Sequence, residues 1–386
     1  MFEEIISFKN LLKAYYRTRS NKRFRKKLQK IELDFEDRLI NIGKQLKNGS
    51  YKPKQYHQFL VYEPKLRRIS APAVIDRVVH HAIINIIEPI FDRQFTPNTF
   101  ACRKGKGTHF GMLQVAACYK KIAQKQSVFY ALKCDIKSYF ASIDHKILIK
   151  FLAQSILCQR TFKLLKIIIN SYHDSPGKGI PIGNLTSQLF ANIYLHRLDV
   201  FVTKELKEEH YFRYMDDFVI LSPDKTYLIQ LREKIRTFLQ SNLELTLHPR
   251  KANIFMAGRG LDFIGYMIKP TGITIRKKTL RRYKKRHKKR LKQLREYKRL
   301  KKIQGLAQPS LFEDRQENNP KAEQSAEKIK ALKTKIRASR NSLKGFLRYS
   351  KYERLKTGGV EVNGIVIPRI FPKKKYTPLL SNCKKV

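Results

Sequence analysis

The sequence predicts an α+β protein of two or three domains, and three observations support this fold class. Apolar residues recur every four positions over Val74–Phe91, the pattern of a buried helix. Two short runs rich in aromatic and β-branched residues, Tyr211–Tyr214 and Phe218–Leu221, flank three residues and predict a tight β-hairpin. The 386 residues are 42% hydrophobic and include 23 Phe and 19 Tyr, enough to fill a sizeable core.

The composition indicates a large polyanionic partner. Lysine and arginine number 82 against 31 acidic residues, and the resulting net charge of +51 repels itself unless it is neutralised. We expect nucleic acid. An anionic membrane surface is the alternative, but the sequence has no apolar run of about 18 residues, and Met1–Ile5 shows no signal-peptide pattern. We therefore expect a cytoplasmic protein with no membrane partner.

The five cysteines predict reduced, buried thiols. Their odd number and the absence of any Cys-x-x-Cys spacing argue against both a disulfide framework and a zinc site. They are Cys102, Cys118, Cys134, Cys158 and Cys383.

The first third of the chain predicts a basic helical extension followed by a strand and a buried helix. Apolar positions at helical spacing over Leu28–Leu46 indicate an amphipathic helix that ends near Gly49. Lys65–Pro72 is a basic, strand-like segment whose proline stands near the start of the buried helix Val74–Phe91.

The middle of the chain alternates between helix and strand. Gly111–Gln126 predicts a helix, and Val128–Asp135 predicts an apolar strand suited to the interior of a sheet, which ends on an acid. Gly177–Ser187 is a glycine-rich turn that runs into a helix, which Asn184 can cap and which continues to about Val202.

The remaining elements are one helix, three short strands and a basic helical pair. Lysine and arginine are 17 of the 27 residues in Arg276–Lys302, whose thin apolar stripe predicts a helix with one face on protein and the others on a polyanion. The polar, proline-broken segment 305–325 predicts a mobile loop. The other expected elements are a helix over Thr226–Leu239, strands over Leu243–Leu247, Lys251–Phe255 and Phe263–Ile268, and a helix over Ile329–Leu347.

Three carboxylates stand at predicted strand ends. Asp135 closes its strand, and Asp216 and Asp217 lie near the tip of the hairpin. An Asp-Asp pair alone more often reflects a turn preference. Carboxylates brought together on one sheet, however, are ligands for Mg²⁺, which completes its shell with water and substrate phosphates. Two such ions about 3.5 to 4 Å apart would activate a 3′-hydroxyl and hold a triphosphate.

With these motifs in this order, the sequence resembles the reverse transcriptases over roughly residues 60–350. Tyr214-Met-Asp-Asp217 is similar to the catalytic hairpin of that family, and Asp135–Phe140 to its first metal-binding motif. Phe263–Ile268 resembles the primer grip, and Arg276–Tyr349 the helical thumb. The shared order and spacing of the motifs make the resemblance specific.

The resemblance implies a right-hand polymerase with an antiparallel sheet and helices in its fingers and palm, and a basic, helical thumb. It implies an RNA-directed DNA polymerase that uses two Mg²⁺ ions, for which Mn²⁺ can substitute, and that binds template RNA, cDNA or primer, and deoxynucleoside triphosphates. The expected domains are an N-terminal extension (1–60), fingers with part of the palm (61–133), palm (134–270), thumb with the loop 305–325 (271–352) and a basic tail (353–386).

The resemblance also assigns roles to individual residues. Phe140 would be the steric gate that excludes ribonucleotides by clashing with their 2′-hydroxyl. The expected catalytic acids and metal ligands are Asp135, Asp216 and Asp217, with Ile136 as a further metal ligand. The expected nucleotide-binding residues are Lys65, Arg67, Ile136, Ser138, Tyr139, Phe140, Ile182, Gly183 and Lys251. The expected primer and template residues are Tyr214, Met215, Ile264, Gly265, Tyr266, Arg281, Lys285 and Lys289.

The glycine-rich turn departs from most of the family, in which a glutamine precedes the glycine and a proline follows the serine. Those positions hold Ile182 and Gln188 here, and the run Gly183–Asn192 is similar to reverse transcriptases of diversity-generating retroelements. That resemblance implies a bacterial or phage-borne enzyme that errs often at template adenine and works with a small, basic, oligomeric accessory protein. Loss of one hydrogen bond worth about 0.5 to 1.5 kcal/mol relaxes discrimination roughly two- to tenfold.

Two other readings stay open. An intron-type or defence-associated reverse transcriptase would share the same catalytic residues, although nothing after the thumb shows a zinc or H-N-H nuclease pattern and a ribonuclease H domain has no room. A catalytically silent RNA-binding scaffold is the non-enzyme alternative, against which the three intact acids speak.

Overall fold

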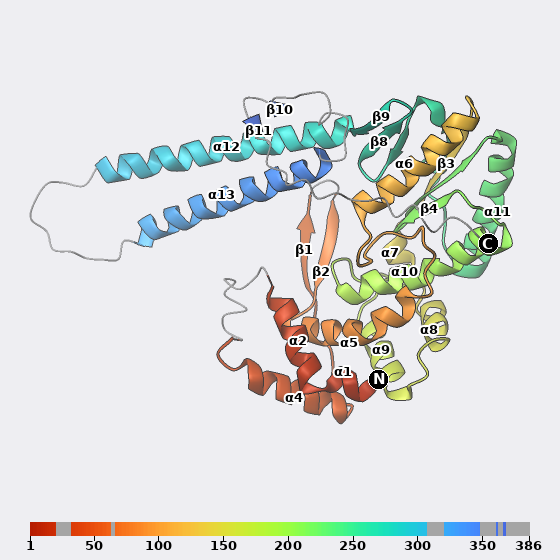
Figure 1. Ribbon diagram of the computed structural model, residues 1–386. Coiled ribbons are helices and arrows are strands. Elements are labelled where there is room, and N and C mark those ends of the chain that lie inside the picture. The colour runs from red at the N-terminus through yellow and green to blue at the C-terminus, as the bar shows by residue number, and fades with distance from the viewer. Residues whose placement is uncertain (21–31, 63–65, 307–319, 348–359, 362–365, 368–386) are drawn as a thin grey trace, which may run out of the picture. The chain divides into compact units, whose positions relative to one another are not determined.

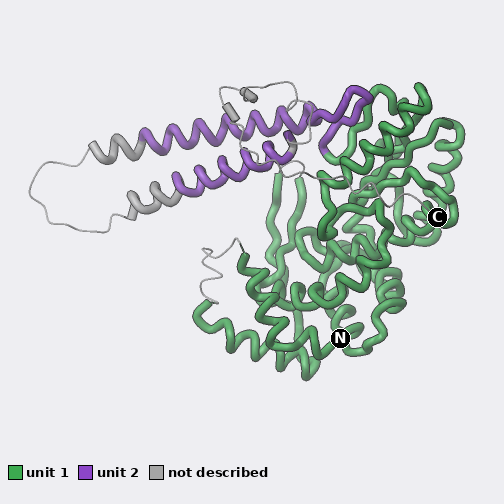
Figure 2. The backbone as a smooth tube through the Cα atoms, viewed as in Figure 1, with its two compact units in different colours: residues 1–264 green, residues 265–386 purple. Residues whose placement is uncertain are grey.

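The computed structural model describes all residues except 21–31, 63–65, 307–319, 348–359, 362–365 and 368–386 (Figure 1). The chain divides into two units, residues 1–264 and 265–386 (Figure 2), and each unit is described by itself. Helices and antiparallel sheets together make up the fold, so the predicted α+β class is confirmed.

Unit 1 contains a four-stranded antiparallel sheet in the order β4-β5-β3-β6. The strand β3 (Tyr130–Asp135) pairs with β5 (Asp217–Ser222) on one side and with β6 (Asn253–Met256) on the other, and β4 (Tyr211–Tyr214) is an edge strand. The predicted interior position of the strand that ends on Asp135 is therefore confirmed. A strand with neighbours on both sides and helices over it is buried, which explains the continuous apolar run of β5.

Long helices pack around this sheet and around one another. The helix α11 (Lys225–Leu243) packs on β3 and β5, and α6 (Thr108–Lys125) packs on β4. The helix α10 (Leu185–Val200) is buried on nearly all sides and packs against α5 (Val74–Asp92). Its buried residues are mostly apolar, but polar ones such as Asn192 and Asp199 are also among them. All four helices lie where the sequence predicts them, and Pro89 lies inside α5 without ending it.

Three helices near the N-terminus also pack into the core of unit 1. They are α1 (Phe2–Ile6), α2 (Phe8–Arg19) and α4 (Phe35–Lys47), and α2 packs along α5 (Figure 1). The predicted amphipathic helix is confirmed from Phe35 onward, because Leu39, Ile42 and Leu46 are its buried face. Its expected first turns lie partly in residues 21–31, outside the described residues.

Shorter elements complete unit 1. A hairpin of two strands precedes α5, and short helices follow β3. The second strand of the hairpin lies in the predicted strand-like segment Lys65–Pro72, whereas the first was not predicted. These elements are β1 (His57–Val61), β2 (Arg67–Ala71), α7 (Tyr139–Ser142), α8 (His145–Ala153), α9 (Gln159–Asn170), the π-helix η1 (Phe201–Glu205), the 3₁₀ turn η2 (Ala257–Arg259) and β7 (Leu261–Phe263).

In unit 2, a β-hairpin leads into two long helices. The strands β8 (Tyr266–Lys269) and β9 (Gly272–Ile275) pair antiparallel, and α12 (Lys277–Leu306) packs along α13 (Pro320–Leu347). A small core of Ile275, Tyr283, Leu343 and Leu347 joins the hairpin to both helices. The two-residue strands β10 (Val360–Glu361) and β11 (Val366–Ile367) also pair.

Three predicted elements are wrong in extent or type. Leu243–Leu247 is not a strand, because the helical leucine period of α11 continues to Leu243 and only Leu247 makes an isolated bridge. Phe263–Ile268 is not one strand either, because Ile264 and Gly265 have φ of +41° and +90° and form a turn between β7 and β8.

The loop expected over 305–325 is also shorter than predicted. The helix α12 reaches Leu306, and α13 begins at Pro320 rather than at Ile329. Proline is favoured in the first turn of a helix because it lacks only an N–H that has no partner there. The remainder, 307–319, lies outside the described residues.

The cysteines differ in exposure. Cys134 is buried as predicted, but Cys102 is exposed and Cys118 and Cys158 are half-buried; these four are free thiols. Cys383 lies outside the described residues. In the described ranges, no helix has the length and apolar character needed to cross a membrane.

Candidate active site

The hairpin of β4 and β5 carries two acids at a tight turn. Tyr214 pairs with Asp217, so Met215 and Asp216 alone form the turn. Met215 has φ of +60°, a left-handed conformation that two-residue hairpin turns need and that glycine usually supplies. Because a side chain strains this conformation, surrounding contacts must hold it. Asp216 therefore lies at the tip, and Asp217 begins β5.

Asp135 lies directly opposite Asp217, because the register of β3 and β5 pairs these two residues. Three carboxylates from two distant sequence segments thus meet at one end of the sheet. The backbone carbonyl of Asp135 accepts a hydrogen bond from the His248 N–H at 2.8 Å, which fixes this strand end from the side of β6.

Burial and mutual repulsion favour the protonated forms of the two hairpin acids. Burial raises the pKa of Asp217 to about 6; Lys133 opposes the rise, and Asp135 and Asp216 add to it. Burial also raises the pKa of Asp216, the charge of Asp135 adds to this rise, and Lys251 opposes it. The cluster therefore concentrates negative charge that a bound cation would stabilise.

Two lysines partly neutralise the cluster. The Lys251 ammonium lies 2.7 Å from Oδ2 of Asp135. The Lys133 ammonium lies 3.6 Å from Oδ2 of Asp217 and donates to the backbone carbonyl of Asp262 at 2.7 Å. The charge of the exposed Arg67 on β2 also lowers the pKa of Asp216. Lys65 lies outside the described residues.

The donor chemistry of the cluster fits a hard divalent cation, although the acids do not surround a single position. In the part of the chain that the structure describes, no three His, Cys, Asp or Glu residues are grouped to hold a metal. All the donors are carboxylate oxygens, however, and Oδ1 of Asp217 is buried without a hydrogen-bond partner. Two acids with water and substrate phosphates would complete the shell, once the Lys251 ammonium leaves Asp135.

The segment after Asp135 contains four residues that were predicted to bind the nucleotide, and their side chains differ in exposure. Ile136 and Tyr139 are buried, and the Tyr139 hydroxyl donates to the Ala191 carbonyl at 2.5 Å. The Tyr139 side chain therefore supports the segment from the core and does not face a nucleotide, contrary to expectation. Ser138 is exposed with φ of +48°. Phe140 is half-buried and meets Tyr139 edge to face.

The glycine-rich turn lies against β2. The Ser70 N–H donates to the Ile182 carbonyl at 3.3 Å, and a Cβ added to Gly183 would come within 3.0 Å of the Ile69 side chain. Gly183 also has φ of +109°, which only glycine adopts readily. The structure therefore brings Ile182 and Gly183 to the strand that carries Arg67. Asn184 takes the expected N-cap position of α10 but makes no side-chain capping bond.

The predicted primer and template residues belong to both units. In unit 1, the Tyr214 hydroxyl lies 3.1 Å from that of Thr108, and Met215 packs on the core. In unit 2, Tyr266 is fully buried, so its side chain cannot contact a primer as expected. The cations predicted on α12 are exposed at four-residue spacing, while Tyr283 and His287 form the buried face of that helix. These cations are Arg281, Lys285 and Lys289.

A buried ion pair that was not predicted from the sequence lies beneath the hairpin turn. Arg213 and Asp199 are both fully buried and bonded to each other. A signal was present: Arg213 stands in a strand of aromatic residues, and a buried arginine requires an acidic partner. The partner could not be identified, because Asp199 lies on α10, a different element.

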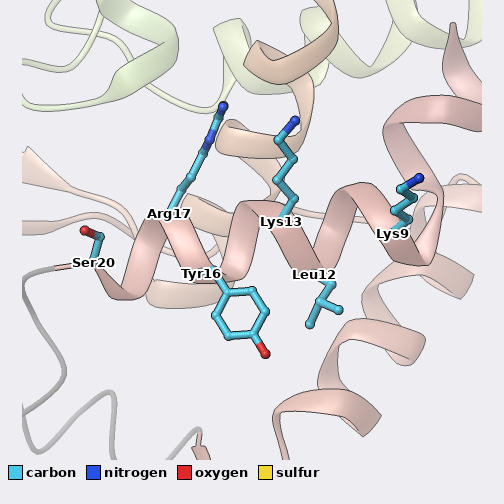
Figure 3. Close-up of a pocket in the computed structure, with 6 residues that line it drawn as sticks. All are labelled: Lys9, Leu12, Lys13, Tyr16, Arg17 and Ser20. Carbon is cyan, nitrogen blue, oxygen red and sulfur yellow. The ribbon is translucent and has the colours of Figure 1, made fainter.

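A pocket of about 510 Å³ lies on α2, an element that carries none of the three acids of the candidate site. Figure 3 shows Lys9, Lys13 and Arg17 projecting from one side of the helix, and Leu12 and Tyr16 from the other. None of its lining residues is a predicted site residue. Its cations suit a polyanion, consistent with the charge of the whole chain.

Comparison with known proteins supports a family assignment. The family model described as reverse transcriptase (RNA-dependent DNA polymerase) matches residues 52–268, more than half of the chain. Protein YkfC of Escherichia coli K12 is 26% identical, with 58% of this chain and 69% of YkfC covered. The group II intron-encoded protein LtrA of Lactococcus lactis subsp. cremoris is 23% identical, with 61% of this chain and 50% of LtrA covered.

Solved structures of low identity are also similar. Apo telomerase from Candida tropicalis, truncated from its C-terminal domain, gives a TM-score of 0.44 at 12% identity, covering 60% of this chain and 58% of that one. The chain thus spans half the length of LtrA and less than two thirds of this telomerase.

Proposed function

Because this chain belongs to the reverse transcriptase (RNA-dependent DNA polymerase) family and has its right-hand fold, we propose that it extends a DNA 3′ end with deoxynucleotides along an RNA template. The observation that carries the proposal is the meeting of Asp135, Asp216 and Asp217 at one end of the four-stranded sheet. We further propose the fingers, palm and thumb at the boundaries that the sequence predicts.

The acids would act by holding two Mg²⁺ ions. Bound between Asp135 and the hairpin acids, the ions would activate the 3′-hydroxyl and stabilise the leaving pyrophosphate. Mn²⁺ can substitute, since it accepts the same oxygen ligands. The carbonyl of Ile136, next to Asp135 at the strand end, is a further candidate ligand.

Cations around the acids would bind the triphosphate. If Asp135 held a metal, the Lys251 ammonium that now lies beside it would be free to bind phosphate. The charge of Arg67 acts to lower the pKa of Asp216, which supports the proposal that its guanidinium binds the same triphosphate. Ile182 and Gly183, close to β2, would line the sugar and base of the incoming nucleotide.

Substituting the acids tests the proposal. Asp135→Asn and Asp216→Asn should each reduce primer extension by orders of magnitude and leave RNA binding nearly unchanged, because a metal ligand is lost while the basic surface remains. The control is Asp224→Asn, the same change at the N-cap of α11, where asparagine caps equally well. Full activity in either active-site variant would refute the mechanism.

The subtype that we propose is an error-prone reverse transcriptase of a diversity-generating retroelement, acting with a small basic oligomeric accessory protein. Its support is the aliphatic Ile182 before Gly183, which cannot donate a hydrogen bond to the nascent pair. Ile182→Gln should lower misincorporation, most clearly opposite template adenine, by at most about tenfold. Sequencing cDNA from wild type, Ile182→Gln and the aliphatic control Ile182→Val measures this effect. Equal errors opposite all four bases in wild type would exclude the subtype.

The alternative is an intron-type or defence-associated reverse transcriptase, which the similarity to LtrA favours. The genomic neighbourhood separates the two possibilities. A nearby imperfect repeat that differs at adenines supports the retroelement, and a flanking self-splicing intron supports the alternative.

A further inference from the structure

We infer that the buried pair of Arg213 and Asp199 is a positioning device that holds the hairpin turn, and with it Asp216, in the geometry needed for metal binding. The inference rests on the proposed polymerase function. It adds two residues that act through the turn and touch neither substrate nor metal.

The pair itself is rigid and fully enclosed. Nε of Arg213 donates to Oδ1 of Asp199 at 2.6 Å, and Nη2 donates to Oδ2 at 2.5 Å. Neither side chain is exposed. A two-pronged contact of this kind fixes the plane of the guanidinium as well as its position.

The remaining nitrogen of the guanidinium reaches the turn. Nη1 of Arg213 donates to the backbone carbonyl of Met215 at 3.0 Å. That carbonyl belongs to the peptide that joins Met215 to Asp216, so the bond orients the peptide plane from which the Asp216 side chain departs. Met215 needs such support, because its φ of +60° is unfavourable for a residue with a Cβ.

Other bonds attach the pair to the body of unit 1. The Tyr211 hydroxyl donates to Oδ1 of Asp199 at 2.8 Å, and the Thr99 hydroxyl donates to Oδ2 at 2.9 Å. Asn192, also on α10, accepts from Nη1 of Arg213 at 3.3 Å and donates to the Ala101 carbonyl at 2.9 Å. The turn is therefore connected through one guanidinium to α10 and to segment 99–101.

The backbone of Arg213 adds to the same connection. Its N–H donates to the Asn98 carbonyl, and its carbonyl accepts from the Phe100 N–H, both at 3.0 Å. The edge strand β4 is thus fixed on the side away from β5. The strained turn is the continuation of a strand that is held along its length, and the guanidinium extends this support to the turn itself.

The test must separate positioning from simple stabilisation, because breaking a buried ion pair destabilises most proteins. The variant Arg213→Lys keeps the charge beside Asp199 but cannot reach both Asp199 and Met215. The double variant Arg213→Gln/Asp199→Asn leaves no unpaired charge in the core. The control is Asp76→Asn, which weakens another buried carboxylate of unit 1, bonded to the Tyr51 hydroxyl and the Lys54 N–H at 3.0 Å each.

Three quantities are measured on each full-length protein: melting temperature, kcat and KM for primer extension, and the Mg²⁺ concentration for half-maximal rate. In both Arg213 variants, kcat should fall roughly ten- to hundredfold, the range for losing one charge-assisted hydrogen bond. The Mg²⁺ requirement should rise, and KM for the nucleotide should stay within about twofold. Asp76→Asn should lower the melting temperature and leave kcat and the Mg²⁺ requirement unchanged.

Wild-type kcat and Mg²⁺ requirement in a folded Arg213→Lys or double variant would overturn the inference. An equal fall of kcat in Asp76→Asn would also overturn it, by showing that lost stability alone explains the effect. Absence of primer extension by the wild-type protein would refute the proposed function instead, so the two failures are distinguishable.

Discussion

At the scale of single residues, Phe140 is the proposed steric gate, and contacts on two sides hold it. Its ring packs edge to face on Tyr139, and its carbonyl accepts from the Ile180 N–H at 2.9 Å, so a rigid support holds a half-buried ring five residues beyond Asp135. If the ring blocks a 2′-hydroxyl, Phe140→Ala should raise the ratio of ribonucleotide to deoxynucleotide incorporation. Single-nucleotide extension with each triphosphate measures the ratio.

The matched control is Phe151→Ala, which removes another half-buried aromatic ring, this one packed on Tyr194 in α10. It should leave the ratio unchanged. If Phe140→Ala also leaves the ratio unchanged, Phe140 is only a packing residue.

Asp217 gives a prediction about pH and stability. Its pKa is raised by burial to about 6 in the folded protein, so the native state binds the proton more tightly than the unfolded chain does. The free energy of unfolding should therefore decrease as pH rises from about 4 to 6, and this loss persists at higher pH. Asp217→Asn cannot ionise, so without metal it should raise the melting temperature more at about pH 8 than at about pH 4.

Adding Mg²⁺ at the higher pH distinguishes the cause. Because the cation stabilises the ionised cluster, it should raise the melting temperature of the wild-type protein more than that of Asp217→Asn. Equal melting temperatures of the two proteins at both pH values would show that the Asp217 carboxylate is not destabilising.

At the scale of elements, the hairpin, the interior strand and the long helices could be predicted from the sequence. Each depends on the spacing of apolar residues and on turn residues within one short segment. One segment fits both the helical and the strand pattern of apolar residues, and there the sequence alone did not decide between them. Leucines at 239, 243, 245 and 247 satisfy both a helical and an alternating pattern. All four are buried, and the helix α11 continues to Leu243, where Glu244 with φ of +49° ends it. Contacts between distant elements, such as that of Arg213 with Asp199, could not be predicted, because neither local segment shows which residue the other partner is.

The helix α12 carries the prediction that belongs to this scale. Its exposed cations Arg281, Lys285 and Lys289 face away from the small core of unit 2. If they bind template or primer phosphates, replacing all three with glutamine should flatten the slope of log affinity against log salt by about two to three units, at roughly 0.7 to 0.9 per contact. Titrating labelled RNA–DNA duplex at several salt concentrations gives the slope.

A charge-matched variant tests whether the location of these cations matters. Replacing the exposed lysines 204, 225 and 234 of unit 1 removes the same charge from η1 and α11. Equal slopes in the two triple variants would mean that net charge, and not α12, sets the affinity.

At the scale of the whole molecule, repulsion within the net charge of +51 destabilises the folded state, and a bound polyanion would relieve this repulsion. Between Glu4 and Glu32 the sequence has ten cations and no acid, and three of these cations are the row on α2 in Figure 3. Self-repulsion of this size lowers the stability of the free protein, and salt screens it over a Debye length of about 10 Å at 0.1 M. The melting temperature of the free protein should therefore rise as sodium chloride increases from low concentrations.

RNA should reverse this dependence. A bound polyanion raises the melting temperature by mass action at low salt, and added salt then weakens binding, so the melting temperature of the complex should fall as salt increases. Differential scanning fluorimetry of protein with and without a long RNA, over one salt series, measures both trends, and an equal concentration of uncharged polymer is the control. A free protein whose melting temperature is insensitive to salt would show that repulsion among the excess cations does not limit its stability, and the net charge would then give no ground for a polyanionic partner.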